Sequence, residues 1–191
     1  AQIRALVAAC RTAWKHHGYG EGDPGARVVA PTFKNERQTY VDRTQMLRIV
    51  RNISNRDVRM VIRIAFYSGM RLGKILRATI KDGRWHLSDT KNGTPRIIPI
   101  HIRLLPASRG PRKMPMRRTV QAAFLNASRR LGYEDLHFHD LRHSAASELI
   151  NAGVDLYTVG AVLGHKDARS TKRYSHLATD TLALAIGNIG K

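Results

Sequence analysis

Four short segments carry side chains that together suit chemistry on a phosphodiester. They are S-G-M-R-L-G-K-I-L with Arg71, H-D-L-R-H-S with His139 and Arg142, L-G-H with His165, and K-R-Y-S-H with Tyr174. A tyrosine hydroxyl can attack phosphorus and form a covalent intermediate, and nearby cations favour the ionised phenol. Guanidinium groups match phosphate oxygens in geometry and bind the charge that builds on them. These residue types therefore predict a nucleophile at Tyr174 and a phosphate-binding pair at Arg71 and Arg142.

The order and spacing of these segments resemble the tyrosine recombinases of the phage-integrase type. That family reads T-G-L-R-x-x-E-[IL], then H-x-L-R-H, then L-G-H, and then a tyrosine nine residues after the last histidine, as Tyr174 follows His165. The stretch T-K-N-G-T-P-R-I-I-P-I, which contains Lys91, is similar to the family's hairpin T-K-x-G-x-x-R-x-[VI]-P-[LI]. The resemblance covers roughly residues 41–178.

The resemblance implies a site-specific recombinase that cuts and rejoins DNA through a 3′-phosphotyrosyl intermediate, with no ATP, metal or other cofactor. It implies six catalytic residues: Arg71, Lys91, His139, Arg142, His165 and Tyr174. Lys91 looks like the general acid that protonates the leaving 5′ oxygen. His139 and His165 would either donate hydrogen bonds to phosphate oxygens or help to move the tyrosine proton, and the sequence leaves both roles open. His143 is expected to contact the catalytic side chains rather than the phosphate, and so to hold them in position.

Lys74 departs from the family pattern, which has an acid three residues after the first arginine. An acid there would pair with Arg71 across one helical turn, whereas a lysine places like charge beside it. Either Lys74 weakens the site, or it turns toward a DNA phosphate while another acid such as Asp140 orients the site. The first case makes a recombination-inactive DNA-binding protein of the same fold the alternative function. A type IB topoisomerase uses the same chemistry, but the L-G-H histidine and the hairpin favour an integrase.

The charge of the chain favours nucleic acid as its partner. Thirty-three Lys and Arg against 14 Asp and Glu give a formal net charge of +19, which repels itself unless a polyanion lies opposite. We expect double-stranded DNA, and the resemblance implies a homotetramer on two DNA sites, with a monomer in free solution. No apolar stretch approaches the length of a spanning helix, so no membrane partner is expected. Candidate DNA contacts are Lys74, Arg109, Arg112, Lys113, Arg117, Arg118, Lys172 and Arg173.

Two further features have structural alternatives. His139 and His143 stand four residues apart and could hold zinc with His165 or His176, but no Cys or Glu completes a usual ligand set, so no metal site is predicted. The single cysteine, Cys10, has no partner for an intrachain disulfide and is expected to be structural. It fits a reducing compartment, and the resemblance implies the cytoplasm of a bacterial host, at the nucleoid.

The elements that must position these residues are mainly α-helices. Residues 1–30 resemble the closing helix and linker of the family's core-binding domain, and residues 31–191 would form the catalytic domain with a C-terminal helix. Asp42, with Gln45 three residues on, predicts a helix N-terminus, and Thr119, Asp140 and Asp155 are further candidate caps. Ser170 or Thr171 would open a short helix that contains Tyr174.

A small sheet interrupts the helices between residues 78 and 100. Asp82-Gly83 and Asn92-Gly93 are hairpin signals that separate three short strands, so the fold class is α+β with a three-stranded antiparallel sheet. The proline-rich and basic stretch 101–118 suits an exposed loop without a regular element; it would either be simply solvated or follow phosphates. A last helix with Leu182, Leu184 and Ile186 would pack on its own domain or, as the resemblance implies, dock on a neighbouring protomer. Of these two alternatives we favour docking.

Overall fold

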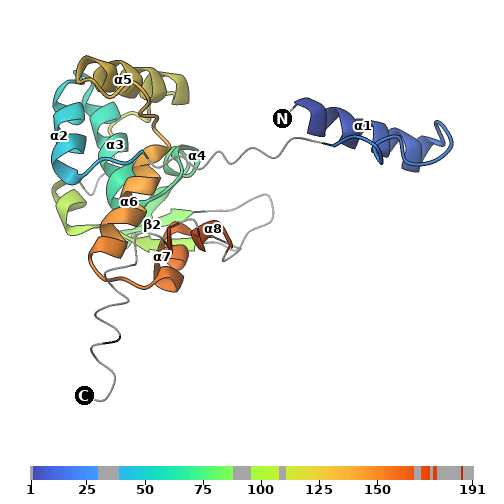
Figure 1. The fold of residues 1–191 in the computed structure, drawn as a ribbon. Helices are drawn as coiled ribbons and strands as arrows, with labels where there is room; N and C mark the ends of the chain where they lie inside the picture. The colour runs from blue at the N-terminus through green and yellow to red at the C-terminus, as the bar shows by residue number, and fades with distance from the viewer. Residues whose placement is uncertain are drawn as a thin grey trace. The chain divides into compact units, whose positions relative to one another are not determined.

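The computed structural model describes residues 2–29, 39–87, 96–107, 111–165, 169–172, 174–175 and 186. The chain divides into two compact units, Ala1–Glu36 and Arg37–Lys191 (Figure 1). The predicted domain boundary at residues 30 and 31 lies outside the described residues and stays a prediction. In the described part of the chain, no helix has both the length and the apolar composition needed to cross a bilayer.

The first unit contains helix α1 (Gln2–His17), none of whose residues is buried. Arg11 Nε donates to both carboxylate oxygens of Asp23 at 3.0 Å, and this ion pair ties the segment that follows the helix back to it. The pair raises the pKa of Arg11 and lowers that of Asp23. Cys10 is exposed, so the expectation that it is structural is wrong for this unit.

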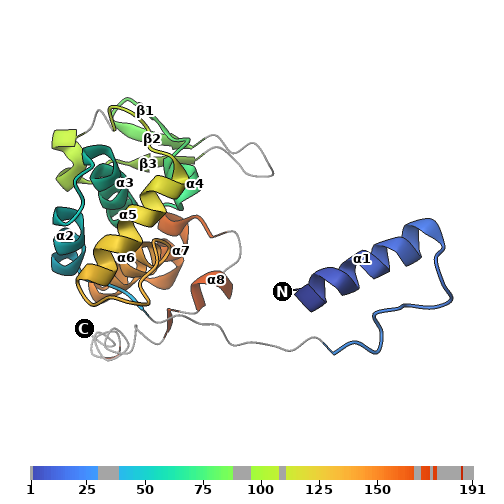
Figure 2. The same cartoon turned by 90° about the horizontal axis from the view of Figure 1, so that it is seen from above.

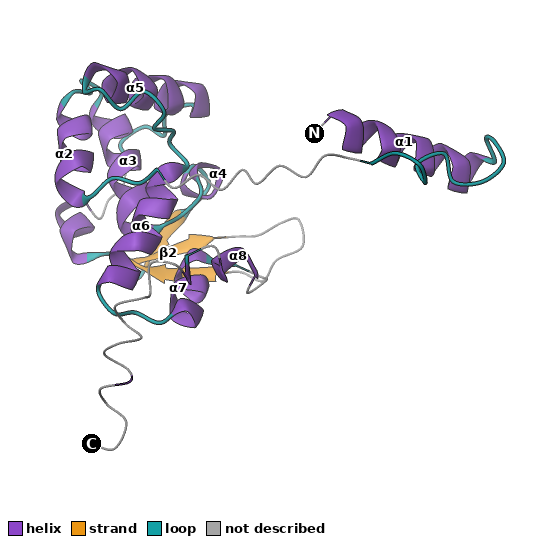
Figure 3. Cartoon of the chain, viewed as in Figure 1, coloured by secondary structure: helices purple, strands orange, loops and turns teal. Residues whose placement is uncertain are grey.

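The second unit is built around helix α3, which contacts four other helices and a 3-10 turn (Figures 1 and 2). A small sheet lies at one edge of the helices (Figure 3). The elements are α2 (Arg43–Arg51), α3 (Arg56–Ser68), α4 (Leu72–Ile75), β1 (Thr79–Lys81), β2 (Arg84–Leu87), β3 (Arg96–Pro99), η1 (Ile102–Ala107), α5 (Arg117–Arg130), α6 (Asp140–Asn151), α7 (Leu156–Leu163) and α8 (Arg169–Lys172). The predicted fold class is confirmed.

Side chains cap two of these helices as predicted. Asp42 accepts the Gln45 backbone N–H, and the Gln45 side chain accepts the N–H of Asp42 in return, which completes a capping box. Asp155 accepts the Thr158 N–H at the start of α7. Two predicted caps are wrong. Thr119 lies inside α5, which begins at Arg117, and Asp140 is the first residue of α6.

The sheet is an antiparallel meander in the order β1-β2-β3. Asp82 and Gly83 both have positive φ, 51° and 67°, as a tight hairpin turn requires. The second predicted turn, Asn92-Gly93, falls outside the described residues. The prediction of no regular element in 101–118 is wrong, because η1 turns Leu104 into the core, where it is 1% exposed, and α5 begins at Arg117.

Two groups of buried apolar side chains hold this unit together. The larger joins α2, α3, α5, the sheet and the start of α6. The smaller contains Ala146, Ile150, Val159, Leu163 and Tyr174, and so joins α6 and α7 to the segment after α8. Burial of such apolar surface is the main favourable contribution to folding. The candidate nucleophile therefore belongs to a packed cluster.

Candidate active site

Tyr174 lies in a turn just after α8, with its backbone N–H bonded to the Thr171 carbonyl at 3.0 Å. The expectation that a short helix contains Tyr174 is wrong, because α8 ends at Lys172. The Tyr174 side chain is only 5% exposed, and its hydroxyl shares a hydrogen bond of 2.6 Å with Nδ1 of His143. A polar ring and a phenol are thus buried together.

His143 also connects Tyr174 to His139. The His139 and His143 rings pack edge to face, with centroids 5.3 Å apart and planes at 87°. Sequence reasoning placed His143 behind the catalytic set, whereas the structure puts it in direct contact with the tyrosine hydroxyl. The four-residue spacing of His139, the N-cap residue of α6, and His143 within that helix is the signal in the sequence, but it says nothing about Tyr174.

Arg142 is held where two helices end. Its side chain is 3% exposed, and Nη1 donates to the carbonyls of Gly69 at 2.8 Å and Leu163 at 2.7 Å. Gly69 caps the C-terminus of α3 with a φ of 62°, and a β-carbon there would lie 2.6 Å from Leu163 Cδ2. Glycine therefore lets α3 and α7 approach closely enough to share one guanidinium.

His165 is oriented by α8. Its Nδ1 shares a hydrogen bond of 2.7 Å with the Thr171 hydroxyl, and its backbone N–H donates to the Gly160 carbonyl. Thr171 is buried against Gly160, where a β-carbon would come within 2.7 Å of its hydroxyl. With the hydroxyl as donor, the ring proton lies on Nε2, the tautomer that can donate to a phosphate oxygen.

Arg96 is a site residue that the sequence reasoning missed. From β3 its Nη2 donates to the carbonyls of Ala161, at 2.7 Å, and Val162, both in the last turn of α7. Partial burial, and then the charge of Arg71, lower the pKa of Arg96. Its guanidinium also occupies the space of a β-carbon on Gly164, whose φ is 71°. The arginine of the R-I-I-P-I strand was the available signal.

Arg71 precedes α4 and faces a cavity of about 590 Å³ that His139 also lines. Lys74 and Arg117 line the same cavity. Asp140, the alternative acid for orienting the site, is buried and accepts the His137 backbone N–H at 2.7 Å.

The other predicted DNA contacts are dispersed. Arg112 and Lys113 lie in a segment whose backbone N–H groups donate to the carboxylate of Asp57 at 2.9 and 3.2 Å. Arg118 and Lys172 are exposed on α5 and α8. Several residues named from the sequence fall outside the described residues. They are the catalytic candidate Lys91, the candidate DNA contacts Arg109 and Arg173, and His176, Leu182 and Leu184.

Within the described ranges no three His, Cys, Asp or Glu side chains are grouped so that they could hold a metal ion.

The chain is similar to known recombinases and integrases. The family model described as "Phage integrase family" matches residues 103–181. A shufflon-specific DNA recombinase of Escherichia coli is 29% identical over 93% of this chain and 49% of its own length. The chain spans 49% of the length of that recombinase, and 58% of the tyrosine recombinase XerA of Saccharolobus solfataricus, which is 26% identical over 82% of this chain.

Solved structures show the same fold. The catalytic domain of bacteriophage HP1 integrase matches with a TM-score of 0.65 and 24% identity, over 78% of this chain and 94% of that one. A lambda integrase tetramer bound to a Holliday junction matches with a TM-score of 0.65 and 21% identity, over 87% of this chain and 57% of that one. The motifs and the fold thus agree: over residues 103–181 the chain is similar to the phage integrase family, and its second unit has the fold of an integrase catalytic domain.

Proposed function

We propose that this chain carries the catalytic domain of a site-specific recombinase that cleaves and rejoins duplex DNA through Tyr174. The observation that carries the proposal is the buried hydrogen bond between the Tyr174 hydroxyl and His143, one residue after the anchored Arg142. A core tyrosine needs only one polar partner. Here that partner is a histidine, whose ring nitrogen can take up the phenol proton. The residue before it, Arg142, has a guanidinium suited to binding phosphate.

In the first step the Tyr174 oxygen forms a bond to phosphorus while the bond to the 5′ oxygen breaks. The tyrosine proton passes to His143, and the leaving oxygen takes a proton from Lys91, so that a 3′-phosphotyrosyl bond and a 5′-hydroxyl result. The phosphodiester energy stays in the new bond, and attack by a 5′-hydroxyl reverses the step. Neither a metal nor ATP is therefore required.

Arg71, Arg142, His139 and His165 are proposed to bind the non-bridging oxygens in this step. Fixed donors are worth most where charge develops, because they need not reorganise during the reaction. Arg142 and His165 are each held by hydrogen bonds to neighbouring elements, which supports this assignment.

Duplex DNA is the proposed substrate, and the net charge of +19 supports it. We propose a homotetramer on two DNA sites and a monomer in free solution, because a structural neighbour forms a tetramer on a Holliday junction. Such a substrate would place the reaction in the cytoplasm of a bacterial host, at the nucleoid. The matched relatives are recombinases, so they lend no support to the inactive alternative.

The test is incubation of the chain, without metal or ATP, with a pool of nicked duplexes whose cleavage region is randomised. The nick lets a short fragment diffuse away, which traps the adduct, and sequencing of trapped DNA reports the preferred site. We expect adducts with the unaltered chain and with Tyr157→Phe, a matched control because Tyr157 is 88% exposed on α7, and none with Tyr174→Phe. No adduct despite measured binding of the pool would contradict the proposal and favour a DNA-binding protein that does not recombine.

A further inference from the structure

We propose that the cavity beside Arg71 is a second phosphate subsite, which holds a DNA backbone phosphate next to the one attacked. This inference rests on the proposed function. The cavity, of about 590 Å³, is lined by four permanent cations, Arg71, Lys74, Arg77 and Arg117, together with His137 and His139. No Asp or Glu is among the described residues that line it. A concentration of one sign of charge in a concave site attracts an anion.

Two of the arginines converge because residue 73 is glycine. Arg77 Nε donates to the Gly73 carbonyl at 3.0 Å. A β-carbon on Gly73 would lie 2.5 Å from Arg117 Nη2 and 4.0 Å from Arg77 Nη2. Both guanidinium groups thus approach one point, one from the turn after α4 and the other from the start of α5, which lie beside each other (Figure 2). Like charges that approach one point repel each other, and a phosphate with several acceptor oxygens has the geometry to bridge them.

The position of the cavity favours a nucleic acid strand over a free phosphate. Arg71 and His139 line the cavity and also belong to the proposed catalytic set, so the two sites are continuous. A DNA strand carries a negative charge at each step of about 3.4 Å along its axis, so a strand with one phosphate at Tyr174 must place others close by. The rest of the lining is Gly73, Gln121 and the apolar side chains of Leu72, Leu125 and Phe138, so the cations supply all of the permanent charge that faces an anion.

The first experiment measures the affinity of a fluorescent duplex against salt concentration by anisotropy. We expect Arg117→Gln to weaken binding several-fold and to lower the slope of log K against log salt by about one, as for one lost phosphate contact. Gly73→Ala should do the same without loss of fold, since the nearest atoms to the new methyl group are the ends of the flexible Arg117 and Arg77 side chains. Arg130→Gln is the control, because Arg130 is exposed at the C-terminal end of α5, the helix that begins at Arg117. It should leave the slope of log K against log salt unchanged.

The second experiment identifies the phosphate once a trapped site is known. Each phosphate that flanks the cleaved one is replaced, one at a time, by a neutral methylphosphonate. At one position this replacement should weaken DNA binding by the unaltered chain but leave DNA binding by Arg117→Gln unchanged. Unchanged slopes in both Arg117→Gln and Gly73→Ala would overturn the subsite and leave the recombinase proposal intact if Tyr174 adducts still form. Reduced slopes without any adduct would support the subsite and contradict the recombinase. Arg117-dependent binding of inorganic phosphate, with DNA affinity unaltered, would overturn the subsite in favour of a free-anion site.

Discussion

The Tyr174 hydroxyl lies 2.6 Å from Nδ1 of His143, and both side chains are buried, at 5% and 8% exposure. The bond fixes the direction of the phenol, and with Nδ1 unprotonated it supplies an acceptor for the phenol proton. His143 is therefore both the proposed proton acceptor and the residue that orients the proposed nucleophile, and its removal should affect the reaction far more than DNA binding.

His143→Ala is expected to slow adduct formation by roughly 100-fold, in the range for loss of a proton acceptor. His143→Asn should recover part of this loss, because its amide oxygen can stand where Nδ1 does and can still orient the phenol, although the amide cannot take up the proton. Single-turnover trapping at saturating DNA measures both rates, with His86→Ala on β2 as the control. Adduct formation at the unaltered rate in His143→Ala would contradict the positioning role.

Gly164→Ala should destabilise the fold through two separate effects. The φ of 71° would cost an alanine about 1–2 kcal/mol, and the new methyl group would overlap the Arg96 guanidinium, at about 1–3 kcal/mol more. Gly153→Ala is the matched control, because its φ is 80° but nothing lies within 4 Å. Urea unfolding should show a clearly larger loss for Gly164→Ala. In an Arg96→Ala background the two losses should become equal, and a persistent difference would exclude the Arg96 contact as its cause.

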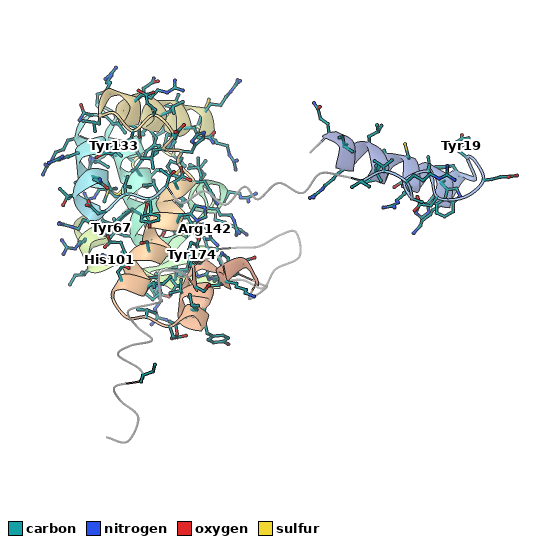
Figure 4. The ribbon with its side chains drawn as sticks, in the orientation of Figure 1. Tyr19, Tyr67, His101, Tyr133, Arg142 and Tyr174 are labelled. Atoms are coloured by element: carbon teal, nitrogen blue, oxygen red, sulfur yellow. The ribbon has the colours of Figure 1, made fainter. Side chains whose placement is uncertain are left out.

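His101 should make the stability of the second unit depend on pH. Its ring stacks on Tyr67 with centroids 4.6 Å apart, and its Nδ1 accepts the Arg103 N–H, so protonation breaks that bond (Figure 4). Partial burial, and then Arg103, lower the pKa of His101 below its ordinary 6.5. The unfolded chain thus binds the proton more readily, and the stabilisation is present above about pH 6.5 and lost as the pH falls through the lower folded value.

The measurement is the free energy of unfolding from about pH 8 to pH 5 for the unaltered chain and for His101→Phe, which keeps the aromatic stack. The unaltered chain should lose more stability over this range, because the other histidines titrate alike in both proteins. Parallel curves would show that His101 does not contribute to the pH dependence.

Lys74 stands where the family pattern that the sequence resembles has an acid. Its position in the lining of the cavity favours a role in binding a DNA phosphate. Lys74→Gln should weaken duplex binding several-fold and lower the salt slope by about one, with Lys74→Glu weaker still. At saturating DNA the rate of adduct formation should remain unchanged in Lys74→Gln. A faster rate in Lys74→Glu would instead mean that the lysine impairs Arg71.

Residues close together in the sequence were enough to predict two helix caps, one hairpin turn and the resemblance to the tyrosine recombinases. Asp42 with Gln45 identified a helix start, and Asp82-Gly83 identified a hairpin, because caps and tight turns depend on residues within a few positions. The order and spacing of the motifs around Arg71, Arg142, His165 and Tyr174 identified the tyrosine recombinases.

Which side chains meet depends on contacts between residues far apart in the sequence. The His143–Tyr174 bond joins residues 31 apart in sequence, the Arg96–Ala161 bond residues 65 apart, and the Arg142–Gly69 bond residues 73 apart. Such contacts depend on how α3, α6 and α7 pack against one another and on the glycines that let them approach. The same packing drew Leu104 into the core and made a 3-10 turn of a stretch whose prolines and charges predicted a loop. Long-range packing therefore decided the partners of each functional group, and local sequence pattern carries no record of it.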